Sequence, residues 1–205
     1  MTEAEARSWL RTQFGVSRET LCADLVTFVL AENDRQNLIS PSTIPDIWSR
    51  HVIDSAQLLD HVPDTEQLWL DIGTGAGFPG LVVAILRDAP MLLVEPRRRR
   101  AEFLAAAVEA LNLSSRVTVS MTKVEQLQDI RAAVISARAV ARLDTLFAAA
   151  IHCAGPETQW VLPKGQSAAD EVAEARVSWH GVFQMIPSRT NADARIILAE
   201  RVRAR

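Results

Sequence analysis

The stretch that decides the fold is residues 71–80, DIGTGAGFPG, which overlaps the short apolar run LWLDI at residues 68–72. An apolar run that ends in glycines is typical of a buried strand in a parallel sheet. Glycine adopts a positive φ and lets a ligand approach the backbone closely. Pro79 fits the first turn of a following helix. The stretch therefore predicts a strand, a tight turn and a helix, with a ligand at the carboxyl end of the strand.

Two cofactors fit this turn. Residues 75–80 match the GxGxxG fingerprint of dinucleotide-binding proteins, and residues 71–77 match the DxGxGxG loop of S-adenosyl-L-methionine methyltransferases. S-adenosyl-L-methionine carries an amino group and a sulfonium but no pyrophosphate, so a carboxylate at Asp71 attracts it and repels a dinucleotide. The turn therefore favours S-adenosyl-L-methionine; a nicotinamide dinucleotide and a turn without a ligand remain alternatives. The candidate cofactor-binding residues of the loop are Asp71, Gly73, Gly75 and Gly77.

Acidic residues follow the next two expected strands. Glu95 ends the strand predicted at residues 91–95, where an acid accepts hydrogen bonds from the ribose hydroxyls of either cofactor. A carboxylate that is only solvated at a strand end is the alternative. Val124 and Glu125 follow the strand predicted at residues 117–120, where an adenine ring is expected to lie.

Strands and helices alternate along most of the chain. Strands are predicted at residues 68–72, 91–95, 117–120, 132–137, 159–162, 183–186 and 195–200, with helices between them. This alternation indicates right-handed crossovers and an open, mostly parallel seven-stranded sheet with helices on both faces. Residues 1–62 have helical periodicity, including a helix predicted at residues 46–61, and are expected to form an N-terminal helical cap. Residues 63–205 are expected to form one compact α/β domain of the Rossmann-like class I methyltransferase type.

The composition is that of a globular protein, with 48% hydrophobic and 23% charged residues and a net charge of −3. Cys22 and Cys153 each lie in an apolar stretch, which predicts buried thiols in a reducing compartment. Residues 2–7 alternate charges where a signal peptide needs an apolar run, and no apolar run has the length of a membrane span. The four histidines lack metal-ligand spacing. We therefore expect a cytoplasmic protein, a monomer, that uses neither a membrane nor a metal.

Several separated segments resemble the glucose-inhibited division protein B family, whose members methylate guanine N7 in the 16S RNA of the small ribosomal subunit. Besides the glycine loop, the segments that carry the resemblance are QNL at residues 36–38, RHxxDS at 50–55, VE at 124–125, RAVA at 138–141, KG at 164–165 and Arg195. The RHxxDS and RAxA segments are more specific than the loop, which many methyltransferases share. Lys123 and Pro163 depart from the residues usual in the family.

The resemblance implies the residues of the site. It implies that S-adenosyl-L-methionine is bound by Gly73, Phe78, Val124, Glu125 and Arg138. It also implies that Lys164 and Arg195 handle the RNA substrate.

Arginines at two further places are candidates for RNA contact. Arg97 and Arg98 belong to a run of four arginines that opens a helix, where the helix dipole disfavours positive charge. This run is interpreted either as an RNA-phosphate contact or as a solvated basic surface. Arg201, Arg203 and Arg205 are expected to form a frayed, solvated terminus.

No general base is predicted, because guanine N7 already presents a lone pair and the sequence contains no evident Ser/His/Asp or Cys/His arrangement. Alignment of the reacting atoms is then the main source of catalysis. His51 and Asp54 share a helix face and are expected either to tie the cap to the domain or to border the cofactor. Two other functions remain open: a non-enzymatic RNA-binding or ribosome assembly factor, and a nicotinamide-dependent oxidoreductase.

Overall fold

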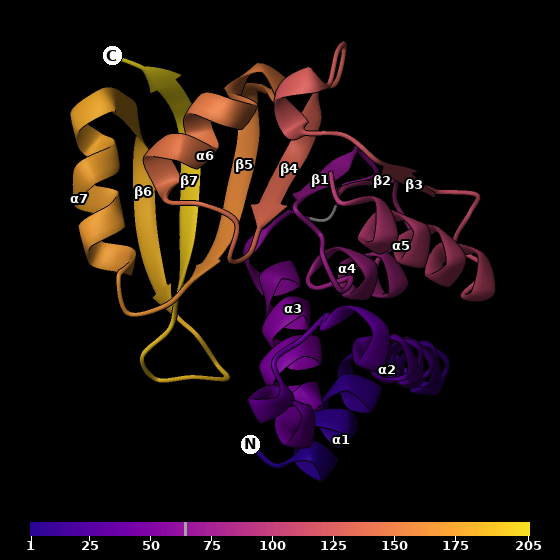
Figure 1. The fold of residues 1–205 in the computed structure, drawn as a ribbon. Helices are drawn as coiled ribbons and strands as arrows, with labels where there is room; N and C mark the ends of the chain where they lie inside the picture. Colours follow the sequence, from indigo (N-terminus) through magenta and orange to yellow (C-terminus); the bar gives the residue numbers. More distant parts are fainter. Residues whose placement is uncertain (64) are drawn as a thin grey trace.

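The sheet has the predicted strand content and direction. The computed structural model describes residues 1–63 and 65–205 and contains a seven-stranded sheet in the order β3-β2-β1-β4-β5-β7-β6 (Figure 1). The strands are β1 (Trp69–Ile72), β2 (Met91–Val94), β3 (Val117–Ser120), β4 (Ala132–Ala137), β5 (Ala154–Lys164), β6 (Trp179–Pro187) and β7 (Arg195–Ala204). The pairs from β3 through β5 are parallel, and β7 is antiparallel to both of its neighbours. The predicted mostly parallel sheet is confirmed, and the strand order reverses between β1 and β4, where α/β sheets bind ligands.

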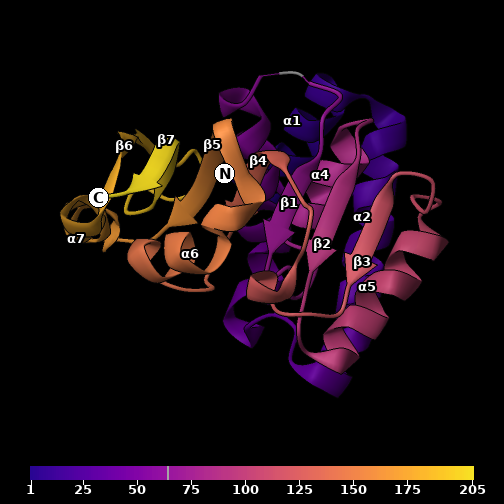
Figure 2. The same cartoon turned by 90° about the horizontal axis from the view of Figure 1, so that it is seen from above.

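Helices cover both faces of the sheet. The α-helices are α1 (Glu3–Phe14), α2 (Val16–Gln36), α3 (Asp54–Ala56), α4 (Gly80–Leu86), α5 (Arg98–Ala110), α6 (Leu143–Ala150) and α7 (Ala168–Ser178). Residues of α1 to α5 pack in one core, and α6 and α7, which lie side by side in Figure 2, pack in a second core on the opposite face. Successive side chains of a strand face opposite sides of the sheet. In β1, for example, Trp69 packs in the first core and Leu70 in the second. In the part of the chain that the structure describes, no helix combines the length and apolarity needed to cross a bilayer.

The N-terminal helices pack directly on the sheet domain. The α1 helix begins with a capping box between Thr2 and Glu5, and the buried Glu19 of α2 pairs with Arg7 and Arg11 of α1. Helices α2 and α3 contact α4 within the first core. The cap is therefore continuous with the core of the domain, and the division near residue 62 stays a proposal.

The segment predicted as one helix at residues 46–61 is built from three kinds of turn. A π-helical turn spans Trp48–Ile53, α3 follows, and a 3-10 helix spans Gln57–His61. The carboxylate of Glu3 accepts hydrogen bonds from the backbone N–H groups of Trp48 and Ser49 at 2.9 and 3.1 Å, which holds the start of the segment against α1. A π-turn changes the direction of its side chains relative to an α-helix, and such turns are frequent at functional sites.

The prediction of a frayed C-terminus is wrong. Strand β7 continues to Ala204, and Arg203 is paired with His180 of β6. The backbone N–H of Arg205 donates to the carbonyl of Ser178. Antiparallel pairing satisfies the backbone of this polar end, while the arginine side chains remain exposed.

Candidate active site

The glycine loop after β1 has the backbone geometry that its sequence requires. Gly73, Gly75 and Gly77 have φ values of 65°, 60° and 96°, in the left-handed region that favours glycine. A Cβ atom on Gly73 would lie 2.6 Å from Cγ2 of Val140, so a side chain there would also collide with the segment after β4. The loop is therefore shaped for close approach of a ligand or of another segment to its backbone.

Asp71 acts on the loop from inside the protein. Its carboxylate is fully buried and accepts hydrogen bonds from Ser136 Oγ at 2.5 Å and from the backbone N–H of Gly80 at 3.2 Å. Burial raises the pKa of Asp71 to about 6, against the hydrogen bonds from Ser136, Thr74 and Gly80, which lower it. The expectation that this carboxylate meets the positive charge of a cofactor is not met by this geometry. A side chain closed off between two strands holds the loop in place instead.

A cavity of about 360 Å³ opens at the carboxyl ends of β1, β2 and β4, and we call it the glycine-loop cavity. It brings together four of the predicted cofactor residues, Gly73, Glu95, Val124 and Glu125. Glu95 is buried and accepts hydrogen bonds from the backbone N–H groups of Gly75 at 3.0 Å and Arg97 at 2.9 Å. Glu95 thereby links the loop to the start of α5 and presents a carboxylate at the cavity wall.

A second cavity, of about 630 Å³, lies between the cap and the domain, and we call it the cap cavity. It is lined by three of the predicted residues, Arg138, Lys164 and Arg195, together with Arg50 of the cap. The acidic residues in its wall, Asp54 and Glu171, are both ion-paired and mostly buried. The free charge at the surface of the cap cavity is therefore predominantly positive.

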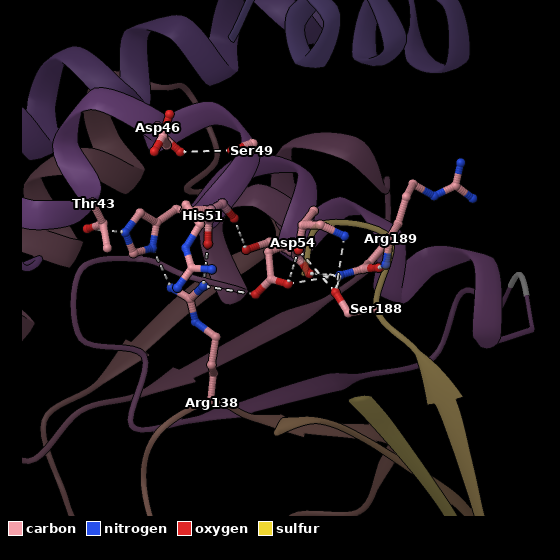
Figure 3. Close-up of polar contacts among 12 residues, drawn as sticks. Thr43, Asp46, Ser49, His51, Asp54, Arg138, Ser188 and Arg189 are labelled. Atoms are coloured by element: carbon pink, nitrogen blue, oxygen red, sulfur yellow. Dashed lines mark hydrogen bonds and ion pairs between the residues drawn. The ribbon is translucent and has the colours of Figure 1, made fainter. Parts of the chain in front are cut away.

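Arg138 joins the cap to the domain (Figure 3). Its guanidinium lies 3.2 Å from the carboxylate of Asp54 and donates to Nδ1 of His51 at 2.9 Å. Burial, with the nearby charges of Arg138 and Arg50, lowers the pKa of His51 to about 3, so the ring is neutral at physiological pH. Nδ1 accepts from Arg138, and Nε2 then carries the proton toward Thr43 Oγ1, 2.9 Å away. The structure therefore supports the interpretation that His51 and Asp54 tie the cap to the domain.

The same carboxylate holds the loop between β6 and β7. Asp54 accepts a hydrogen bond from Thr190 Oγ1 at 2.9 Å, and Gln57 accepts one from the backbone N–H of Arg189 at 2.8 Å. Arg189 also pairs with Asp60 at 3.0 Å. Figure 3 shows Asp54 between Arg138 on one side and Ser188 and Arg189 of this loop on the other. One polar cluster thus fixes the cap, the end of β4 and the β6–β7 loop relative to one another.

Phe78 lies beneath this cluster. Its ring stacks on His51 with centroids 5.0 Å apart, and the Arg138 guanidinium lies 5.7 Å from its centroid. Phe78 is buried and, among the described residues, lines neither cavity, and the same is true of Gly75 and Gly77. These three residues shape the loop from behind, while Arg138 faces the cap cavity rather than the glycine-loop cavity.

Lys164 and Arg195 are directly paired across β5 and β7. The Lys164 ammonium lies 2.8 Å from the Glu171 carboxylate and donates to the carbonyl of Ala141 at 2.6 Å, and its side chain is 9% exposed. Burial acts to raise the pKa of Glu171, but the bonds from Lys164 and Ser167 outweigh it and hold that pKa below its usual value. Arg195 is more accessible and donates to the carbonyls of Ala192 and Ala194. A contact of either residue with RNA stays a prediction, and the buried ion pair of Lys164 is a feature that sequence reasoning missed.

The two arginines predicted at the start of α5 differ in their surroundings. Arg97 lines the glycine-loop cavity, as does Arg100. Arg98 points into solvent, with a side chain 81% exposed, and pairs with Glu102 at 2.7 Å. An RNA contact of Arg97 and Arg98 stays a prediction.

Sequence reasoning missed the part of the site that only folding assembles. Ala139, Val140 and Ala141 line both cavities, and Glu171, Thr190 and Asn191 line the cap cavity. The RAVA motif at residues 138–141 was a signal for the first group. For Glu171 and the β6–β7 loop the sequence contains no such signal.

The sheet order and the helices on both faces define the fold of class I S-adenosyl-L-methionine-dependent methyltransferases. Among solved structures, the chain is similar to a putative S-adenosyl-L-methionine-dependent methyltransferase from Methanococcus maripaludis, with a TM-score of 0.58, 13% identity, and coverage of 74% of this chain and 84% of that one. It is also similar to the ribosomal protein L11 methylase of Lactobacillus delbrueckii subsp. bulgaricus, with a TM-score of 0.55, 15% identity, and coverage of 72% and 77%. At these identities the likeness concerns the fold.

The sequence comparisons identify the family. The family model described as rRNA small subunit methyltransferase G matches residues 18–193. The chain is 46% identical to the ribosomal RNA small subunit methyltransferase G of Rhizorhabdus wittichii, over all of this chain (100%) and 95% of that protein. It is 41% identical to the protein of the same name from Zymomonas mobilis, over 98% of this chain and 95% of that one. The chain belongs to the rRNA small subunit methyltransferase G family, which confirms the predicted resemblance.

Proposed function

We propose that this protein transfers a methyl group from S-adenosyl-L-methionine to N7 of a guanine in the 16S RNA of the small ribosomal subunit. The observation that carries the proposal is the pair of adjoining cavities, which share residues 139–141 as a common wall. One cavity is bounded by the glycine loop and an acid at a strand end, and the other is lined by cations. This arrangement fits a methyl donor on one side and a nucleotide on the other.

The residues present fit the methyl donor. Gly73 lines the glycine-loop cavity, and its positive φ and its packing against Val140 exclude a side chain, so its backbone is what a ligand there would meet. Glu95 presents a carboxylate that is already held by two backbone N–H groups, in the position expected to accept hydrogen bonds from ribose hydroxyls. Val124 is buried and offers an apolar surface for an aromatic base. Gly73, Glu95, Val124 and Glu125 would hold the donor.

The chemistry requires alignment rather than proton transfer. The donor supplies an electrophilic methyl group: as guanine N7 forms the new N–C bond with its lone pair, the C–S bond breaks and its electron pair stays on sulfur, with no proton transferred. The state of His51 is consistent with a mechanism without proton transfer. Its low pKa leaves the ring neutral, and both ring nitrogens are engaged by Arg138 and Thr43. Arg50 and Arg195, at the surface of the cap cavity, would attract RNA phosphates.

The proposal is tested with tritiated S-adenosyl-L-methionine and two substrates, whole small subunits and naked 16S RNA. Label should enter the RNA, and borohydride reduction followed by aniline should cleave the product at one guanine, because this treatment is selective for N7-methylguanosine. Calorimetry with S-adenosyl-L-methionine and with NADH tests the two other functions. Binding of NADH alone would support an oxidoreductase, and RNA binding without label transfer would support an assembly factor.

Two further properties belong to the proposal. We propose a cytoplasmic location, because a small ribosomal subunit is the substrate. We also propose that the protein acts as a monomer, since both cavities are formed within one chain. Sedimentation of the protein alone and with RNA measures this directly, and a stable dimer would contradict it.

A further inference from the structure

Residues 139–141, which we call the dividing strap, lie between the two cavities and contribute to the lining of both. The strap follows β4 and precedes α6. Among the residues that the structure describes, every other lining residue of the two cavities belongs to one of them only. The dividing strap is therefore the wall that the two cavities have in common.

The strap is fixed at both ends by side chains from distant parts of the chain. Before it, Arg138 is bound to Asp54 and His51 of the cap. At its end, the carbonyl of Ala141 accepts a hydrogen bond from Lys164 at 2.6 Å. Ala139 has a φ of 57°, a conformation that alanine adopts rarely and keeps only where its surroundings hold it. These contacts give the strap one defined position.

Val140 is the central residue of the strap and is exposed, as is Ala139 before it. Its side chain is 44% exposed, although it is apolar and its segment is fixed. It lies directly over Gly73, since Cγ2 would be 2.6 Å from a Cβ atom built on that glycine. A β-branched side chain has a restricted χ1, and the contact of Cγ2 with Gly73 fixes one side of Val140 against the loop. Val140 thus presents a rigid apolar surface where the two cavities meet.

We propose that Val140 contacts both the methyl donor and the acceptor base, and that Lys164 is a positioning residue that acts through the carbonyl of Ala141. This inference rests on the proposed function. Methyl transfer requires sulfur, methyl carbon and N7 in line, and an error of about 1 Å can reduce the rate about 100-fold. A wall that touches both reactants controls that alignment. Its apolar surface also offers no hydrogen bond that would compete with the base edges.

The first experiment replaces Val140. In Val140→Ala we expect kcat with small subunits to fall about tenfold or more, with KM for the subunits changed less than threefold, because alignment rather than RNA affinity is affected. Val177→Ala is the matched control: Val177 lies on α7, is 76% exposed, and lines neither cavity. Equal kcat values for Val140→Ala and the wild-type protein would overturn the role of Val140.

A binding measurement tests the two contacts of Val140 separately. In protein with 13C-labelled valine methyl groups, the Val140 signals are assigned by their loss in Val140→Ala. They should shift when S-adenosylhomocysteine is added and shift again when an RNA substrate follows. A shift with only one of the two would overturn the proposed double contact. If the wild-type protein transfers no label to RNA, the proposed function fails, whatever the methyl signals show.

The second experiment separates positioning by Lys164 from its contribution to stability. Lys164→Met alone leaves the Glu171 carboxylate buried without its ammonium partner, so the variant should lose both stability and kcat. The double variant Lys164→Met/Glu171→Gln removes both charges, keeps an acceptor for the backbone N–H of Leu143 and should recover stability, but kcat should stay at least tenfold low because the Ala141 carbonyl has lost its donor. Recovery of kcat together with stability would show a purely structural role and overturn the assignment of Lys164.

Discussion

Replacing Asp54 by Asn should loosen the cap, the end of β4 and the β6–β7 loop together. Asp54 is 16% exposed and accepts hydrogen bonds from Arg138, Thr190 and Gln57. An amide has one acceptor atom where the carboxylate has two, so at least one of these donors would face an NH2 group. Hydrogen bonds to charged groups contribute about 1.5–3 kcal/mol, and exposed ion pairs contribute about 0–1 kcal/mol. For this mostly buried carboxylate we expect a loss of about 2 kcal/mol.

The matched control is Asp60→Asn. Asp60 also joins the cap to the β6–β7 loop, through Arg189 at 3.0 Å, but both side chains are substantially exposed, at 39% and 47%. The same substitution should therefore reduce the free energy of unfolding by only about 0.5 kcal/mol. Urea unfolding followed by tryptophan fluorescence measures both values, because Trp69 and Trp160 are fully buried. For Asp54→Asn the melting temperature should fall by about 4–8 °C.

A double-mutant cycle with Arg138→Met isolates the ion pair. We expect a coupling energy between Asp54 and Arg138 of about 1 kcal/mol or more, since their charged groups lie 3.2 Å apart and both are mostly buried. Equal losses for Asp54→Asn and Asp60→Asn, or additive losses for Asp54 and Arg138, would refute the reasoning that burial makes this cluster the main connection of the cap.

Three further outcomes follow from the site. Asp71→Asn should flatten the pH dependence of the free energy of unfolding. Burial raises the pKa of Asp71 to about 6, so the folded state keeps this proton at pH values where the unfolded state has lost it. The stability that results is full below pH 3.8 and is lost as the pH rises through 6. Urea titrations of both proteins at pH 4 and pH 7 should show their stability difference changing by about 2 kcal/mol, and an unchanged difference would contradict the raised pKa. Gly73→Ala should weaken S-adenosyl-L-methionine binding at least tenfold in calorimetry, because of its φ of 65° and its contact with Val140; wild-type affinity would remove this loop position from the donor site. Arg195→Ala should reduce the slope of log K for RNA against log salt by about 0.7 if Arg195 contacts one phosphate, and an identical slope would show that it contacts none.

Much of the fold could be predicted because the strand signals are local. The strands at residues 117–120 and 132–137 have the predicted bounds, since each is a short apolar or β-branched run between polar or turn-forming residues. The C-terminal strands were predicted too short. Residues 154–158 contain Gly155 and Pro156, so only pairing with β4 reveals them as part of β5. Residues 201–204 alternate arginine with Val202 and Ala204, and pairing with β6 extends β7 through them.

The sequence predicted which residues belong to the candidate site better than it predicted where their side chains point. A strand residue faces one of two sides, and the sequence does not say which side of β1 is closed, so the Asp71 carboxylate was expected in the cavity but lies buried against Ser136. Lys164 was expected to contact RNA because it follows a strand at the ligand-binding edge. Its buried ion pair with Glu171 depends on the packing of α7 against the sheet, which no local pattern encodes.

The cap cavity has walls from both ends of the polypeptide: Arg50 and His51 on one side, and Thr190 and Arg195 on the other. Deleting the N-terminal helices would consequently not produce a smaller working catalyst. It would open the substrate side to water, unfasten the hairpin near the C-terminus and uncover the face of the sheet on which these helices pack. Competence toward RNA should thus depend on contact between the first and the last segments of the chain.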